Sequence, residues 1–377
     1  MEFSRTQLRC SVQIDLYALE RNLGKIRHYM PGEKSYIALV SADAFGIGME
    51  AAAARLMLSG ADAFAVTNLS EAARVRKVGQ GWPVIVLSAS VPGEETFFIE
   101  RDITAVLASL EEVERFEAAA EKLGKKAVVH MKLPSANPNL SIPDVAQARA
   151  MLAAIMGSQW LTLEAFCVAG TGTGAPEESD IPDPGFLRHA AGTLINLGQK
   201  AYIHHSDMFD ASILPEGFQT SLRAGLVLFG IAPEKNSVLE TFKPEQVITF
   251  RSAVSHIKRL PKGAYVGYAK TYRLERDSKI ALLSVGYGDG LARSASSNAN
   301  VIIRDTLVPI IGRVSMDQVA VDVTNLARVE LSDEAIIIGS SQTHSISIEE
   351  YCGRLGISPA EALTSFTQRV VRIYRQS

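Results

Sequence analysis

Histidine and cysteine side chains bind metals or carry redox chemistry where their spacing allows it. His204 and His205 resemble a metal-binding pair, but adjacent residues on a strand point to opposite faces, and no third ligand is evident. Cys10, Cys167 and Cys352 are far apart and odd in number, which predicts reduced, structural thiols. The sequence therefore predicts no metal centre and no disulfide framework.

The size and composition of the chain limit the classes to which it can belong. Its 377 residues predict two domains, or one barrel with an appendage. A net charge of −3 with interspersed signs gives no broad basic face, which argues against a nucleic-acid binder and favours a small ligand. No apolar run is long enough to span a membrane, and the first residues have no apolar stretch after their charges. We therefore expect a cytoplasmic protein without a membrane segment.

From about residue 11 to residue 233, short β-branched runs alternate with segments of helical spacing, which predicts repeated β-α units. The eight runs are 36–40, 63–67, 83–88, 104–108, 127–132, 163–168, 201–205 and 226–230. The helical segments between them include 49–58, 69–78, 110–123 and 142–156. This content predicts an α/β fold, a (β/α)8 TIM-type barrel over residues 1–240, with its chemistry at the C-terminal ends of the strands.

After about residue 247 the pattern changes to short strands separated by Gly, Pro, Asn and Asp, which predicts a C-terminal, mostly-β domain over residues 241–377. Its expected strands are 252–260, 279–284, 301–304, 308–311, 318–323 and 335–338. A helix is expected at 347–355 with Ser347 as its N-cap. The segment 171–184, rich in Gly, Thr and Pro, is predicted to be a long loop, either a lid or a surface excursion.

Five strings resemble, in order, the motifs of the alanine racemase family. The string Ala-Leu-Val-Ser-Ala-Asp-Ala-Phe-Gly-Ile-Gly at 38–48 resembles the loop that carries that family's cofactor lysine. The others are Leu-Arg-Ala-Gly-Leu at 222–226, Val-Gly-Tyr-Ala-Lys-Thr-Tyr at 266–272, Gly-Tyr-Gly-Asp-Gly at 286–290 and Gly-Arg-Val-Ser-Met-Asp-Gln at 312–318. Each string alone is a weak signal, but their order over nearly the whole chain predicts a fold-type III pyridoxal-phosphate protein.

The resemblance implies a chemistry and two residue roles. In the family, pyridoxal phosphate acts as the electron sink for removal of an amino-acid α-proton. A lysine holds the cofactor and serves as one base, while a tyrosine serves as the other. Tyr272 falls on that tyrosine, and Arg223 falls on the arginine that contacts the pyridine nitrogen. Without a bound ring, we expect Arg223 to make a structural pair instead.

Further positions match the family's cofactor and substrate sites. Gly225, Leu226 and Tyr287 match residues that bind the cofactor phosphate. Met316 and Asp317 match the pair that the partner subunit contributes to the substrate site. The resemblance thus implies an active site shared between two chains.

The departures from the family pattern cluster on the cofactor. Ser41 occupies the lysine position, and a hydroxyl cannot form an imine with an aldehyde. Phe45 replaces a phosphate-binding tyrosine, and Ile47 replaces a neighbouring histidine. Asn139 replaces the arginine that supports the cofactor oxygen and the tyrosine, so a fixed positive charge is lost.

Weaker correspondences point the same way. Ala169 aligns with the histidine that stacks on the ring, Phe209 is the nearest counterpart of a phosphate-binding serine, and Gln368 stands where some members have a tyrosine. Lys132 and Lys270 are the candidates for a substitute amine, although Lys132 lies at a strand end and Lys270 in the other domain. The sequence therefore leaves covalent rescue open but does not favour it.

Two functions stay open. The leading hypothesis is a pseudoenzyme: an alanine racemase homologue that has lost the Schiff-base lysine and survives as a non-catalytic partner or small-ligand binder, with pyridoxal phosphate bound, if at all, without a covalent link. The alternative is a pyridoxal-phosphate-dependent racemase that uses a non-covalent cofactor or a substitute lysine. The family's head-to-tail homodimer implies a homodimer here. A heterodimer with an intact homologue is the other possibility, in which Tyr272 and Met316 would complete a neighbour's site.

Overall fold

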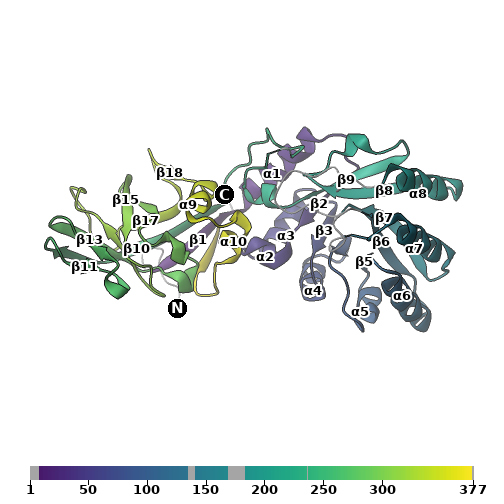
Figure 1. Ribbon diagram of the computed structural model, residues 1–377, viewed down its shortest axis with the longest axis horizontal. Helices are drawn as coiled ribbons and strands as arrows, with labels where there is room; N and C mark the ends of the chain where they lie inside the picture. Colours follow the sequence, from purple (N-terminus) through teal and green to yellow (C-terminus); the bar gives the residue numbers. More distant parts are fainter. Residues whose placement is uncertain (1–7, 135–140, 169–182, 236, 376–377) are drawn as a thin grey trace.

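The computed structural model describes residues 8–134, 141–168, 183–235 and 237–375. They form a barrel domain and a β domain arranged along the long axis of the molecule (Figure 1). Within these residues, no helix has both the length and the apolar character needed to cross a membrane.

Eight parallel strands close into a barrel in the order β2 to β9, which confirms the predicted fold. The strands are β2 (Ser35–Leu39), β3 (Ala63–Val66), β4 (Val84–Val86), β5 (Ile103–Leu107), β6 (Ala127–Lys132), β7 (Leu161–Cys167), β8 (Ala201–Ser206) and β9 (Phe218–Ala224). The covering helices are α3 (Met49–Leu58), α4 (Leu69–Val78), α5 (Glu95–Glu100), α6 (Leu110–Leu123), α7 (Val145–Gly157) and α8 (Pro184–Asn196), outside the strands in Figure 1.

Polar caps fix where several of these helices begin. The side chains of Asn68, Ser109 and Asp144 accept hydrogen bonds from the first turns of α4, α6 and α7. Asn68 and Ser109 each lie two residues after the end of a barrel strand, so helices α4 and α6 have defined starts at the C-terminal ends of the strands. These strand ends form the barrel mouth, where the site is expected.

The eighth strand is not where the sequence pattern placed it. Residues 226–230 form the 3₁₀ turn η4 (Leu226–Phe229), and β9 precedes them. Strand β9 lacks a continuous apolar run because Ser221 and Arg223 face cavities inside the barrel. The η4 turn is apolar because it is buried against α1 (Leu16–Tyr29), where the Asn22 amide donates to the Leu228 carbonyl at 3.1 Å.

The β domain is built on a nine-stranded sheet in the order β18-β17-β14-β15-β16-β13-β10-β1-β19. The strands are β1 (Cys10–Asp15), β10 (Ile248–Leu260), β13 (Ser278–Leu283), β14 (Asn300–Ile303), β15 (Thr306–Ile311), β16 (Val319–Asp322), β17 (Glu334–Ser340), β18 (Ser345–Ile346) and β19 (Val371–Arg375). A small hairpin, β11 (Tyr265–Val266) with β12 (Tyr272–Arg273), and the helices α9 (Ile348–Leu355) and α10 (Pro359–Thr364) complete the domain.

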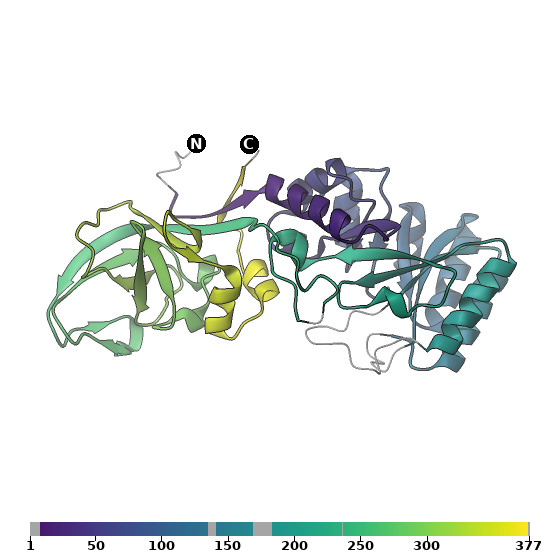
Figure 2. The ribbon, with the colours of Figure 1, turned by 90° about the horizontal axis from the view of Figure 1, so that it is seen from above.

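One strand of this sheet comes from the start of the chain. Strand β1 pairs antiparallel with β10 and parallel with β19, so residues 10–15 belong to the C-terminal sheet rather than to the barrel. Figure 2 shows β1, in purple, running along the β domain before α1 begins in the barrel domain. The expected division at residue 240 therefore needs this correction at the N-terminal side, because sheet pairing joins segments that are distant in sequence.

Candidate functional site

Ser41 lies at the barrel mouth, directly after the first barrel strand, where the family's lysine is expected. Strand β2 ends at Leu39, and Ser41 begins the short turn α2 (Ser41–Phe45). The Ser41 hydroxyl oxygen is buried and has no hydrogen-bond partner among the described residues. The side chain at this position thus offers a hydroxyl and no amine.

The turn after Ser41 has a strained backbone. Residues 42–45 have φ angles of 52°, 58°, 54° and 51°, although none of them is glycine. Left-handed backbone costs an L-residue roughly 1–2 kcal/mol. The Glu71 carboxylate accepts a hydrogen bond from the Ala42 N–H at 2.6 Å and helps to hold the turn. Such strain persists only where the surroundings impose it, which is typical of a functional site.

The C-terminal segment packs against the end of this turn at Gly46. Gly46, with φ of 78°, lies so close to α10 that a Cβ there would come within 2.3 Å of the Leu363 carbonyl oxygen. The Arg372 Nε donates to the Gly46 carbonyl at 3.0 Å, and the Tyr374 hydroxyl donates to the Ile47 carbonyl at 2.9 Å. The β domain of the same chain therefore fixes the conformation at the mouth of the barrel.

A cavity of about 410 Å³ opens at the mouth and gathers four of the predicted cofactor residues, Phe45, Arg223, Gly225 and Leu226. Its other lining residues are Leu39, Leu87, Ser206, Asp207, Met208, Val227, Ala232, Pro233 and Glu234. The Phe45 ring packs against Phe229 with centroids 5.0 Å apart, so the position expected for a phosphate donor is apolar. No lysine lines this cavity within the described part of the chain.

Arg223 is held from inside the barrel. Its side chain is buried, and Nη1 lies 2.6 Å from His204 Nδ1 and donates to the His204 carbonyl at 3.0 Å. Nη2 donates to the Val168 carbonyl at 2.8 Å. The structural pair expected in the absence of a ring is therefore present, and it involves His204.

Two carboxyl groups line the mouth cavity, Asp207 and Glu234, and neither was singled out from the sequence. Burial raises the pKa of Asp207, while a hydrogen bond from the Ser237 hydroxyl opposes that rise. Asp207 follows strand β8 directly and lies two residues before Phe209, the nearest counterpart of the family's phosphate-binding serine. The replacement of that serine was the signal available in the sequence, but it does not show which way the Asp207 carboxyl group faces.

The remaining predicted site residues lie in the β domain, apart from the mouth cavity of the same chain (Figure 1). Tyr272, in β12, packs in a small cluster with Val266 and Leu274. Tyr287 and Met316 are 49% and 50% exposed. One chain therefore places Ser41 and Arg223 in the barrel domain, and Tyr272, Tyr287, Met316 and Asp317 in the β domain.

Neither candidate for a substitute amine lines the mouth cavity. Lys132 lines a different cavity, next to Glu112 and Arg115. Lys270 lies in the β domain with its ammonium 5.8 Å from the Tyr265 ring centroid.

The two adjacent histidines face opposite ways, as expected for a strand. His204 points into the barrel, while His205 is buried 3.2 Å from the Glu33 carboxylate and its ring packs against Phe209. Across the described ranges, no three His, Cys, Asp or Glu side chains are placed to hold a metal ion. Of the other predicted substitutions, Ile47 is buried and Gln368 exposed. Asn139, Ala169 and residues 171–182 lie outside the described residues.

A (β/α)8 barrel followed by an antiparallel β domain defines the class, that of the fold-type III pyridoxal-phosphate proteins. The family model "Alanine racemase, N-terminal domain" matches residues 14–233, and "Alanine racemase, C-terminal domain" matches residues 247–374. The chain belongs to the alanine racemase family.

Individual relatives match over almost the full length. An alanine racemase of Methylacidiphilum infernorum is 31% identical over 97% of this chain and 93% of its own. Alanine racemase 1 of Caldanaerobacter subterraneus is 27% identical over 96% of this chain and 94% of its own. The solved alanine racemase of Streptomyces coelicolor superposes with a TM-score of 0.86 at 22% identity, covering 99% of both chains. That of Bartonella henselae, solved with covalently bound pyridoxal phosphate, gives a TM-score of 0.79 at 22% identity over 98% of this chain and 100% of its own.

Proposed function

We propose that this chain is an alanine racemase homologue that does not hold pyridoxal phosphate covalently and serves as a non-catalytic or ligand-binding protein. The observation that carries the proposal is the hydroxyl of Ser41, directly after β2, together with a mouth cavity that no lysine lines among the described residues. Without an amine there, an aldehyde cofactor has no covalent anchor and the site lacks one of the family's two bases.

The lining of the mouth cavity does not suit the phosphate group of the cofactor. Phosphate esters carry close to two negative charges near neutral pH, whereas this cavity presents Asp207 and Glu234 and, from Phe45, an apolar ring. Asp207 is partly buried, where like charges repel each other more than they do in water, whereas Glu234 is exposed. Arg223 is the one basic side chain in the described lining, and Nη1 and Nη2 already bond to the barrel. We therefore assign no step to the cofactor.

The same lining suits a different ligand. Most of its side chains are apolar, with a guanidinium contributed by Arg223 and carboxyl groups by Asp207 and Glu234. Apolar walls with a few polar groups are the usual composition of a small-molecule site. We infer a small, partly apolar ligand that carries an amine.

An absorbance spectrum tests the main proposal. The purified protein is incubated with pyridoxal phosphate, passed through gel filtration, and measured before and after borohydride treatment. The expected result is no retained chromophore, because Ser41 cannot anchor the aldehyde. A retained band that borohydride fixes to the chain would show that another lysine is in use and would overturn the proposal.

A second function has its own support. All the relatives described above are called alanine racemases, and the matches span both domains, so the comparisons favour racemisation more than they favour its loss. In this reading the cofactor is non-covalent, or Lys132 or Lys270 replaces the missing amine. The test is alanine racemisation with added pyridoxal phosphate, repeated with Lys132→Ala and Lys270→Ala. Activity that one of these variants abolishes would identify the substitute lysine, whereas activity that survives both would indicate non-covalent cofactor.

We also propose a cytoplasmic homodimer. Tyr265, Tyr268, Tyr287 and Met316 are between 49% and 71% exposed on the β domain, as expected for surfaces that a second chain covers. In the alternative heterodimer, this chain would donate Tyr272 and Met316 to an intact homologue. Co-expression would then change that homologue's racemase rate and its elution volume, and unchanged values would exclude the heterodimer.

A further inference from the structure

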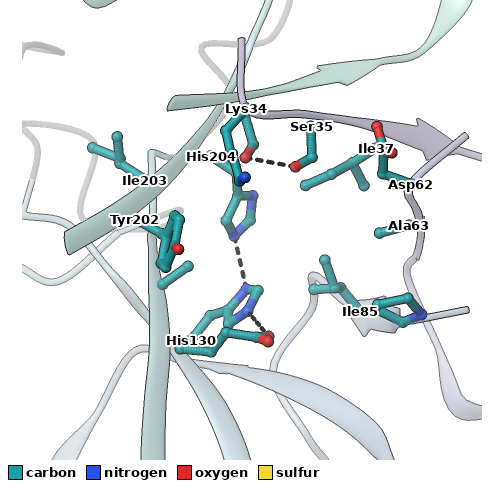
Figure 3. Close-up of a pocket in the computed structure, with 14 residues that line it drawn as sticks. Lys34, Ser35, Ile37, Asp62, Ala63, Ile85, His130, Tyr202, Ile203 and His204 are labelled. Carbon is teal, nitrogen blue, oxygen red and sulfur yellow. Dashed lines mark hydrogen bonds and ion pairs between the residues drawn. The ribbon is translucent and has the colours of Figure 1, made fainter. Parts of the chain in front are cut away.

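A second cavity lies inside the barrel at the end opposite the mouth. It measures about 310 Å³, and Figure 3 shows His130 and His204 on one side of it, with Ile37, Ala63 and Ile85 on the other. Barrel interiors of this type are usually filled by bulky side chains. Here small residues such as Ser35, Ala63 and Ser221 line the space, so two buried histidines stand beside a cavity.

A continuous hydrogen-bonded chain links this closed end to the mouth. Arg223 Nη1 lies 2.6 Å from His204 Nδ1. His204 Nε2 lies 3.0 Å from His130 Nδ1, and His130 Nε2 lies 2.9 Å from a Glu164 carboxylate oxygen, as the dashed lines in Figure 3 show. Glu164 is half exposed at the closed end, whereas Arg223 lines the mouth cavity.

The direction of each hydrogen bond follows from the chemistry of its ends. A guanidinium can only donate, so His204 Nδ1 accepts. Burial and the nearby charge of Arg223 lower the pKa of His204, which keeps that imidazole neutral. Its single proton is then on Nε2 and is donated to His130 Nδ1. His130 in turn carries its proton on Nε2 and donates it to Glu164.

These hydrogen bonds restrict the orientation of the Arg223 guanidinium. Nη1 and Nη2 are committed to His204 and to the Val168 carbonyl, while Nε makes no hydrogen bond to any residue that the structure describes. Arg223 therefore has a donor left for a ligand in the mouth cavity that it lines. If His204 adopted the other tautomer, its Nδ1–H would face the guanidinium and displace it.

We propose that Glu164 and His130 are positioning residues, which hold Arg223 in the orientation that binds a hydrogen-bond acceptor, such as a carboxylate, of the ligand in the mouth cavity. This inference rests on the proposed ligand-binding function and deepens it, because an acceptor at Arg223 and an amine near Asp207 and Glu234 together describe an amino acid bound without a cofactor. A purely structural role for the chain would require the histidines only for barrel stability.

Nitrogen-15 NMR of histidine-labelled protein tests the chain directly. His130→Gln and His204→Gln assign the two signals. Both imidazoles are expected to carry a proton on Nε2 and to accept a hydrogen bond at Nδ1. Glu164→Gln should keep this pattern, because the amide oxygen can still accept from His130, whereas Glu164→Ala should lose it at both histidines. Lys34→Ala, which alters an exposed side chain at the same cavity, is the matched control and should change nothing. A wild-type histidine carrying its proton on Nδ1, or an unchanged pattern in Glu164→Ala, would overturn the proposal.

Ligand binding supplies the second readout, with L-leucine as the probe and the Arg223 Nε–H signal as the reporter. A positioned Arg223 predicts that Glu164→Ala weakens binding about tenfold, the effect of one lost charge-assisted hydrogen bond, and that Glu164→Gln restores it. Equal affinities in wild type and Glu164→Ala, with only a lower melting temperature in the variant, would show a structural role and contradict the proposal. If L-leucine binds to no variant, the ligand assignment fails by itself, and the histidine spectra still decide whether the chain orients Arg223.

Discussion

At the scale of single residues, the proposed loss of covalent cofactor binding rests on the side chains at the barrel mouth. The resemblance places Ser41 and Phe45 at positions that contact the cofactor in the family, and the structure shows that Asp207 and Glu234 line the mouth cavity together with Phe45. Each change removes a reason for an anionic cofactor to bind there. The serine at position 41 and the carboxyl groups that line the mouth cavity both support the proposed change of ligand preference.

Replacing Ser41 with lysine tests how much of the loss comes from this residue. Ser41→Lys supplies an amine at the mouth, so we expect pyridoxal phosphate to give a chromophore that borohydride fixes to the chain, but with weak retention. The double variant Ser41→Lys with Asp207→Ser should retain the cofactor at least about tenfold better, because it also removes a repelling carboxylate. Equal retention in the two variants would show that Asp207 does not face the phosphate position.

The raised pKa of Asp207 makes a prediction about pH. A carboxyl group whose folded-state pKa is raised stabilises the fold below its unfolded pKa, about 3.9, and this contribution is lost as the pH rises through the folded-state pKa. Asp207→Asn should therefore raise the free energy of unfolding at neutral pH and give no advantage below about pH 4. Urea unfolding at both pH values measures this.

Asp210 is the control for that experiment, because its substitution should change the free energy of unfolding in the opposite direction. Hydrogen bonds from Ser212 lower its pKa, so its contribution to stability is present at neutral pH and is lost as the pH falls through the folded-state value. Asp210→Asn should lower stability at neutral pH. If both variants shift stability in the same direction at neutral pH, the account of Asp207 is wrong.

At the scale of elements, sequence patterns located most helices and strands but not the strained turn. Helices α3, α4 and α6 coincide with the predicted segments, because their spacing and caps are local properties. The left-handed conformation of residues 42–45 is imposed by Glu71 and by the packing of Gly46 on Leu363. The residue types at positions 42–45 do not predict this left-handed conformation.

A glycine substitution should relieve that strain. Ala42→Gly removes the Cβ penalty at a φ of 52° and should stabilise the fold by up to about 1 kcal/mol. The comparison is Ala54→Gly in the right-handed helix α3, which should cost about 1 kcal/mol. Thermal and urea unfolding of both variants checks the difference in sign. A loss of stability in Ala42→Gly would mean that this turn is not under strain.

At the scale of the whole molecule, strand β1 ties the two domains together. It lies between β10 and β19, so residues 241–377 alone would expose the edges of both strands. We expect that segment to aggregate or to lack cooperative unfolding when it is expressed without residues 8–15. Circular dichroism and gel filtration measure this, and a monomeric, cooperatively folded segment would refute the expectation.

The sequence by itself determined the family, the barrel followed by a β domain, and the serine at position 41, because these depend on residue identity and on local periodicity. The tertiary structure decided which residues meet. It placed Asp207 and Glu234 in the mouth cavity, joined Arg223 to Glu164 through two histidines, and moved the eighth strand to residues 218–224. These features depend on which inward-facing side chains of different strands lie next to each other. The strands bring those side chains together only when all eight have closed into the barrel.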